Sequence, residues 1–251
     1  MPRPYSPVHD DLTSTGTYTL RVTAAPGDTG RAAIRVYEAH DVDGTLQPNG
    51  PSVTVEIAQP GARARYRFTG QKGDRVFVEV PEASLTDQCS PLELRDAEGR
   101  LLHSGCVING VGEVDGTLLP ADGAYTVLVD PVERGTGTIT LRLVSGRDGD
   151  GTIAVGGPPV VTTVDRPGAI TAYRFTAAAG TSVTVTATAS NLPDQCGVLV
   201  LRAPDGGTLA TGCVINGAGG VAPTLLPTAG TYTLQVDPSG AATGQVTVAV
   251  R

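Results

Sequence analysis

The stretch Asp87–Gly112, DQCSPLELRDAEGRLLHSGCVINGVG, decides the fold because the chain contains it twice. The second copy, DQCGVLVLRAPDGGTLATGCVINGAG, runs from Asp194 to Gly219 and aligns with the first without a gap. Cys-Val-Ile-Asn-Gly is identical in both copies, and the two copies hold all four cysteines of the chain. This self-similarity indicates a chain built from repeated structural units, each of about 107 residues.

The repetition extends well beyond these two copies. Pro51–Val144 aligns with Pro158–Arg251 without a gap, and 42 of the 94 pairs are identical. Leu12–Tyr37 matches the last third of a unit, since Gly16, Tyr18, Val22 and Gly30 precede Gly123, Tyr125, Val129 and Gly137 by the same constant offset. We therefore predict that residues 1–39 are the C-terminal hairpin of a truncated preceding repeat. Residues 40–146 and 147–251 would be two complete repeats of a longer array.

Within a unit the apolar residues alternate with polar ones. Runs of this kind begin at Val53, Tyr66, Val76, Leu92, Tyr125 and Ile139. Alternation over short runs is typical of half-buried antiparallel strands, and turn signals such as Asn109-Gly110 separate the runs. Eight or nine strands in about 100 residues predict a β-sandwich. The fold class is thus all-β, with tandem antiparallel, jelly-roll-like sandwiches.

Composition limits the function classes. The chain has 251 residues and a formal net charge of −7, and its basic residues are scattered arginines except for Lys72, which argues against nucleic-acid binding. No apolar run is long enough to span a membrane. The three histidines, His9, His40 and His103, do not recur in the second unit, and no nucleophile–base pair stands out. We expect no enzymatic activity.

The four cysteines predict two local disulfides, Cys89–Cys106 and Cys196–Cys213. The two cysteines of each pair lie in the same unit at the same spacing, and no histidine recurs to complete a zinc site. Because disulfides persist in oxidising compartments, the pairs point to an extracellular or cell-surface location.

The linkers supply the candidate metal ligands. Asp41 and Asp43 precede Gly44, and Asp148 and Asp150 precede Gly151 in the same spacing. Calcium favours such short acidic turns, so these four carboxylates are candidate calcium ligands and calcium is the candidate cofactor. The alternative is a solvated turn, which is favoured because the segments lack the distal Glu of a calcium loop.

The pattern resembles the bacterial pre-peptidase C-terminal domain. The resemblance covers nearly all of each unit, and it lies in Tyr-x-Phe-Thr, a glycine, alternating valines, Leu-x-Leu-Arg-x-x-x-Gly and Gly-x-Tyr-x-Leu/Val-x-Val. In the first unit the matching positions are Tyr66, Phe68, Thr69, Gly73, Val76, Val78, Leu92, Leu94, Arg95, Gly99, Gly123, Tyr125, Val127 and Val129. In the second they are Tyr173, Phe175, Thr176, Gly180, Val183, Val185, Leu199, Leu201, Arg202, Gly206, Gly230, Tyr232, Leu234 and Val236. The resemblance implies a non-catalytic β-sandwich attached to secreted bacterial enzymes and surface proteins, and the tandem form is similar to modules of large actinobacterial surface proteins. The paired cysteines depart from the usual family pattern.

Two functions remain open. The first is a structural stalk or adhesion segment of a larger bacterial surface or secreted protein, whose partners would be neighbouring repeats of the same polypeptide. The second is an accessory module of a secreted hydrolase that binds polysaccharide or protein matrix, with a cell-wall or matrix polymer as partner.

Residues 12–37 raise a separate question of assembly. They should form two closing strands, Tyr18–Val22 and Arg31–Tyr37, without the sheets that such strands complete. A lone hairpin is marginal in water. It would therefore pack on the following unit, add to the sheet of another chain in self-assembly, or remain mobile.

Overall fold

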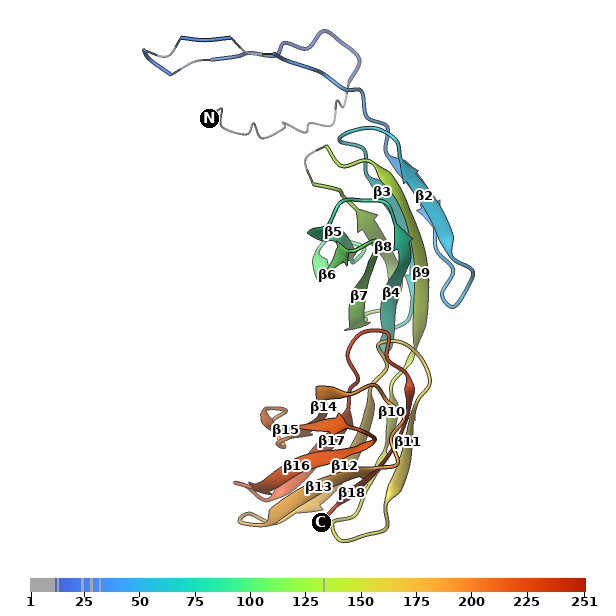
Figure 1. Ribbon diagram of the computed structural model, residues 1–251, viewed down its shortest axis with the longest axis vertical. Coiled ribbons are helices and arrows are strands. Elements are labelled where there is room, and N and C mark those ends of the chain that lie inside the picture. The colour runs from blue at the N-terminus through green and yellow to red at the C-terminus, as the bar shows by residue number, and fades with distance from the viewer. Residues whose placement is uncertain (1–11, 13, 24, 28, 32, 133) are drawn as a thin grey trace.

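The computed structural model describes Leu12 and residues 14–23, 25–27, 29–31, 33–132 and 134–251. Within this part of the chain every regular element is a strand, and no helix is long and apolar enough to cross a membrane. The strands form two nine-stranded sheets that lie end to end along the long axis of the molecule (Figure 1). The predicted fold class, all-β with tandem β-sandwich repeats, is confirmed.

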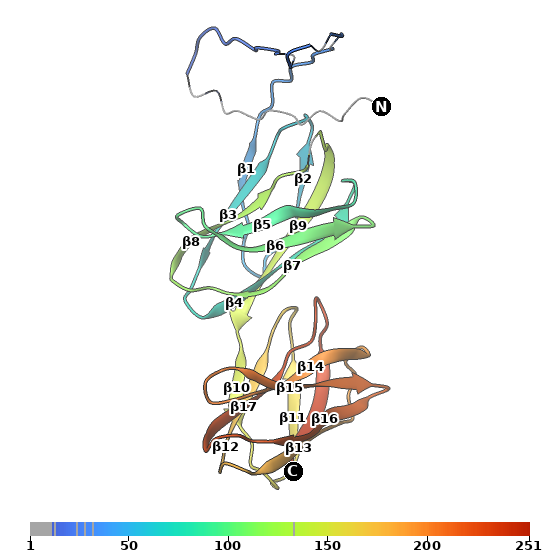
Figure 2. The ribbon, with the colours of Figure 1, turned by 90° about the vertical axis from the view of Figure 1, so that its left-hand side faces the viewer.

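The first sheet runs from Val42 to Arg147 in the strand order β1-β3-β8-β5-β6-β7-β4-β9-β2. Its strands are β1 (Val42–Thr45), β2 (Val53–Ile57), β3 (Ala64–Gly70), β4 (Asp74–Ala83), β5 (Gln88–Arg95), β6 (Leu101–Ile108), β7 (Val111–Leu118), β8 (Gly123–Val129) and β9 (Gly137–Arg147). In Figure 2 the strands β5, β6 and β7 run across the long axis, whereas β2 and β9 follow it. The one continuous sheet therefore folds over into two crossing layers.

The second sheet repeats this order strand for strand, as β10-β12-β17-β14-β15-β16-β13-β18-β11. Its strands are β10 (Gly149–Thr152), β11 (Val160–Val164), β12 (Thr171–Ala177), β13 (Ser182–Thr188), β14 (Gln195–Arg202), β15 (Thr208–Ile215), β16 (Ala218–Leu225), β17 (Gly230–Val236) and β18 (Gly244–Val250). We call the two sandwiches the first and second repeat.

Each repeat has its own aliphatic core with one pair of stacked rings. Phe68 and Tyr125 lie 5.5 Å apart between ring centroids, and the equivalent Phe175 and Tyr232 lie 5.7 Å apart. Leu92, Leu94 and Val127 are among the fully buried residues around the first pair. The alternating residues predicted to face the core thus do so, because period-two alternation places one side of every strand against the other layer.

The repeated turn Asn-Gly joins β6 to β7 and β15 to β16. Asn109 and Gly110 have φ values of 53° and 75°, and Asn216 and Gly217 have 51° and 78°. Positive φ at both central residues is the requirement of a two-residue hairpin turn whose twist matches the strands, and asparagine and glycine meet it at low cost.

The Asp-x-Asp-Gly segments differ from the expected turn. Val42–Thr45 and Gly149–Thr152 are strands, and each pairs in parallel with the next-but-one strand, β1 with β3 and β10 with β12. Val42 and Leu46 alternate with exposed residues and turn toward the core, so this segment closes the edge of its sheet. Between the named strands the pairing is therefore antiparallel except at this edge.

The described residues between Leu12 and His40 contain no strand, where the sequence predicted the pair Tyr18–Val22 and Arg31–Tyr37. Their large apolar side chains stay exposed, with Leu20 56% and Val36 80% accessible. These apolar side chains are thus not buried against the first repeat, although the Tyr37 hydroxyl interacts with Arg134. The equivalent strands β8 and β9 pair with β3, β5, β4 and β2 of their own repeat, whereas the described residues before His40 make no such pairing.

Candidate functional site: the junction between the repeats

The four candidate calcium ligands lie on the edge strands β1 and β10 or directly before them, and each is paired with an arginine. Asp43 lies 3.2 Å from Arg67, and the equivalent Asp150 lies 3.6 Å from Arg174. Asp41 and Asp148 are paired as well, with different partners that are described below. Within the described ranges, no three His, Cys, Asp or Glu side chains gather closely enough to hold a metal ion. Calcium binding at these positions stays a prediction.

The structure contains the disulfides Cys89–Cys106 and Cys196–Cys213. In each pair the two cysteines face each other directly across a hairpin, β5–β6 or β14–β15. A register shift follows each first cysteine, where Ser90 and Gly197 adopt positive φ. The bridges therefore hold together two neighbouring strands at the point where a bulge interrupts their pairing.

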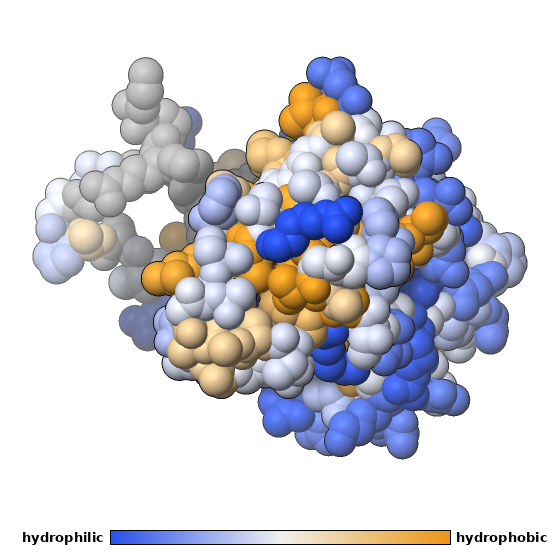
Figure 3. Space-filling view, turned by 90° about the horizontal axis from the view of Figure 1, so that it is seen from below, coloured by the Kyte–Doolittle hydropathy of each residue, from blue (hydrophilic) through white to orange (hydrophobic). Residues whose placement is uncertain are grey.

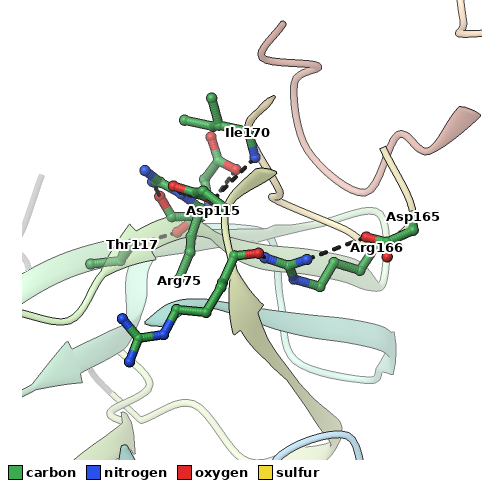
Figure 4. A network of polar contacts seen from close by, with 9 residues as sticks. Arg75, Asp115, Thr117, Asp165, Arg166 and Ile170 are labelled. Atoms are coloured by element: carbon green, nitrogen blue, oxygen red, sulfur yellow. Dashed lines mark hydrogen bonds and ion pairs between the residues drawn. The ribbon is translucent and has the colours of Figure 1, made fainter. Parts of the chain in front are cut away.

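A network of polar residues lies where the repeats meet (Figure 4). β9 leads through Asp148 into β10, and the end of the first repeat that carries Arg75, Phe77 and Gly116 lies against the second repeat (Figure 1). We call this region the junction. Figure 4 shows side chains from both repeats converging there, with Arg75, Asp115 and Thr117 from the first and Asp165, Arg166 and Ile170 from the second.

Arg75 is the central cation of the junction. Its Nε donates to both carboxylate oxygens of Asp148, at 2.9 and 3.0 Å, and its Nη1 donates to the Gly116 carbonyl at 2.6 Å. Asp148 Oδ1 also accepts the backbone N–H of Ile170 at 3.2 Å. Since the Arg75 side chain is only 16% exposed, this ion pair is partly shielded from water and ties the two repeats together.

Apolar and backbone contacts surround the ion pair. Phe77 is 1% exposed although it does not belong to the core of the first repeat. A methyl group added at Gly168 would lie 2.9 Å from the Cδ2 of Phe77 and 2.9 Å from the Cα of Gly116. Gly168, at φ 68°, thus lets the second repeat approach the first backbone to backbone.

Two further contacts complete the junction. The Arg166 guanidinium donates to the carbonyl of Arg147, which fixes the second repeat to the end of β9. Glu113 faces Gly240, because an added methyl there would lie 3.0 Å from Glu113 Oε1. The junction therefore involves β4, β7 and β9 of the first repeat, the linker residue Asp148, and the β11–β12 and β17–β18 loops of the second repeat.

Two partly buried carboxyl groups near the junction, Asp237 and Glu113, have raised pKa values. Burial raises the pKa of Asp237 above its ordinary value, Asp115 and Asp148 raise it further, and Arg75 opposes the rise. Burial also raises the pKa of Glu113, with help from Asp115 and Glu79. Both carboxyl groups are therefore more easily protonated in the folded protein than in the unfolded chain.

The pockets away from the junction differ in their charged residues between the two repeats. Equivalent loops of the two repeats line shallow pockets, beside Asp96 and Arg100 in the first and beside Ala203 and Gly207 in the second. In the first pocket, the Asp96 carboxylate accepts a hydrogen bond from Arg100 Nε at 2.7 Å. The second pocket has no charged residue at the two equivalent positions.

Sequence reasoning did not identify the junction. The sequence did contain a signal. Asp41 aligns with Asp148, but the arginines Arg63 and Arg65 align with the uncharged Ile170 and Ala172. An acidic residue that loses its local partners in one repeat needs a partner from elsewhere.

No family model matches this chain, and no curated protein matches it. Among solved structures, one described as the CUB1-EGF-CUB2 domain of human MASP-1/3 is similar over 80% of this chain and 99% of that chain, with 7% identity and a TM-score of 0.26. A likeness at this level carries no statement about function.

Proposed function

We propose that this chain is a non-catalytic segment of an extracellular structural stalk or adhesion protein of a bacterium, in which β-sandwich repeats are joined end to end by rigid junctions. The repeats act as spacers, and their partners are the neighbouring repeats of the same polypeptide. The bacterial origin rests on the resemblance to the pre-peptidase C-terminal domain.

The observation that carries this proposal is the Arg75–Asp148 junction. A flexible linker between independent modules needs no partly buried ion pair and no glycine contact, whereas a spacer gains stiffness from both. The contacts lie at the ends of the two sandwiches, so the repeats are arranged end to end and not side by side (Figure 1).

The disulfides support the location. A bridge within each repeat suits an oxidising environment outside the cell, where reduction by thiols is slow. Each bridge also closes a loop within one repeat, which keeps every spacer stable independently of its neighbours.

Small-angle X-ray scattering of the whole chain tests the proposal. We expect the distance distribution of an elongated particle, two sandwiches long, that is unchanged over a range of salt concentrations up to about 0.15 M. A compact distribution, with the repeats folded side by side, would contradict the stalk.

A further inference from the structure

We define the head of a repeat as the end that carries Asp148, Arg166 and Gly168 in the second repeat. The equivalent positions of the first repeat are Asp41, Gln59 and Gly61. The tail is the opposite end, with Arg75 and Phe77 in the first repeat and Ser182 and Thr184 in the second. The junction joins the tail of the first repeat to the head of the second.

The equivalent aspartates of the two heads form ion pairs with arginines from different places. Asp41 and Asp148 each accept a backbone N–H from the equivalent residue, Arg63 at 2.8 Å and Ile170 at 3.2 Å. Asp41 is then paired within its own repeat, with Arg65 at 2.6 Å and Arg63 at 3.6 Å. The second repeat has Ile170 and Ala172 at these positions, and its aspartate takes Arg75 from the preceding repeat.

A second pair of positions changes together. A methyl group added at Gly146 would lie 2.7 Å from the Arg166 Nε, so alanine there would displace the Arg166 side chain from its present position. Before the first repeat, Ala39 stands at the position of Gly146 and Gln59 at that of Arg166. The larger residue before the repeat thus goes with the shorter side chain on the head, and the smaller one with the longer.

In the part of the chain that the structure describes, the head of the first repeat is more exposed than the head of the second. Gly168 is buried at the junction, whereas the equivalent Gly61 is only half-buried, and Gln59 is exposed where Arg166 is half-buried. The tail of the second repeat is open as well, with Ser182 exposed and Leu225, its pairing partner on β16, 66% accessible. Figure 3, which views the molecule from this end, shows apolar area there among hydrophilic residues.

We propose that the head of the first repeat is a docking surface for a repeat whose tail is of the second-repeat type, with an uncharged residue at the position of Arg75. Two kinds of junction then alternate along an array: one in which the tail supplies the arginine, and one in which the head supplies it. An arginine tail on the first head would place a third guanidinium beside Asp41, which like-charge repulsion disfavours. The inference rests on the proposed stalk function and adds the identity of the neighbour.

A concatemer tests the docking directly. Residues 1–251 are followed by a second copy of residues 38–251, which keeps the repeat spacing because Arg251 aligns with Val144 and Glu38 with Ser145. We expect the amides of Gly61 and Ala62 in the second copy to exchange hydrogen at least about tenfold more slowly than in the single chain. Unchanged exchange there would overturn the proposal.

Substitutions in the concatemer test the chemistry. Ser182→Arg in the first copy should return the exchange at Gly61 to the rate of the single chain. Thr188→Arg is the matched control, since it adds the same charge at the other end of β13 and should leave the protection intact. If Ser182→Arg keeps the protection, or both variants lose it, the rule of an uncharged tail is overturned.

The native junction offers a rescue in the chain as it exists. Arg75→Ser should speed amide exchange at Gly168 and Ala169, and adding Ile170→Arg with Ala172→Arg should slow it again by recreating the first head. Arg67→Ser, which removes the exposed pair with Asp43, should change neither amide. No effect of Arg75→Ser, or no rescue, would contradict the proposal. Failure of the stalk itself would be seen separately, as compact scattering by the unmodified chain.

Discussion

At Gly168 the second repeat meets the first without room for a side chain. Gly168→Ala should lower the free energy of unfolding by about 2–3 kcal/mol, because alanine is strained at positive φ and its methyl group overlaps Gly116 and Phe77. Gly180 has a φ of 79° and open space around it, so Gly180→Ala should cost only the backbone strain, about 1 kcal/mol. Urea denaturation of both variants makes the comparison. Equal losses would show that the repeats do not touch at Gly168.

Asp237 gives the junction a pH dependence. Because burial raises its pKa in the folded protein, the folded state holds more protons than the unfolded chain between the ordinary value of 3.8 and the raised one. At a pH above this window Asp237 is ionised and lowers the free energy of unfolding. As the pH falls through the raised pKa, the carboxylate is protonated and this destabilisation is lost. Asp237→Asn should be more stable than the unmodified chain at pH 7 and lose this advantage as the solution is acidified. Denaturation curves measured from about pH 7 to pH 4 test this, and parallel curves for the two proteins would refute it.

The residue-scale chemistry was only partly predictable. The cysteine pairing followed from spacing alone, because each pair lies within one repeated hairpin. The partner of Asp148 could not be read from spacing, since Arg75 lies 73 residues earlier and in another repeat. Only the folded chain brings these two residues together.

The β5–β6 hairpin and its equivalent β14–β15 are the elements held by covalent bonds. Replacing Cys89 and Cys106 together by alanine should lower the free energy of unfolding by about 3 kcal/mol, because the bridge restricts a loop of moderate length in the unfolded chain. The double variant at Cys196 and Cys213 should lose a similar amount, since its bridge spans the same separation of 17 residues.

Differential scanning calorimetry of the two double-cysteine variants should show the lower transition in the altered repeat. Adding reductant to either variant should then affect only the bridge that remains. The bridges do not form if the unmodified chain has thiols that react with a thiol reagent and if reductant leaves its transitions unchanged.

At the element scale the strands of the core were predictable and the edges were not. Val53, Tyr66, Val76 and Tyr125 alternate with polar residues, and this pattern fixes which face of a strand is buried. Val42–Thr45 reads as a turn because of Asp43-Gly44, yet its place beside β3 makes it a strand. Leu12–Tyr37 has the pattern of β8 and β9, yet its described residues form no strand, so the pattern alone is not sufficient.

For the molecule as a whole, the sequence repeat gives two equivalent sandwiches, and the differences between the copies give the junction. Positions that agree, such as Phe68 and Phe175, build the cores. Some positions that differ, such as Arg75 and Ser182, lie at the tails of the repeats, and Arg75 contributes to the junction. Sequence identity therefore predicts the fold of each unit, whereas the contacts between units had to be read from the folded chain.

Residual dipolar couplings of the ¹⁵N-labelled chain test most directly whether the junction is rigid. If it is, the couplings of the first repeat (42–147) and the second (149–250) fit one alignment tensor, with the relative orientation seen in Figure 1. Arg75→Ser should separate them into two tensors of unequal magnitude. Two unequal tensors in the unmodified chain would contradict the account, because the repeats would then move independently despite the Arg75–Asp148 pair.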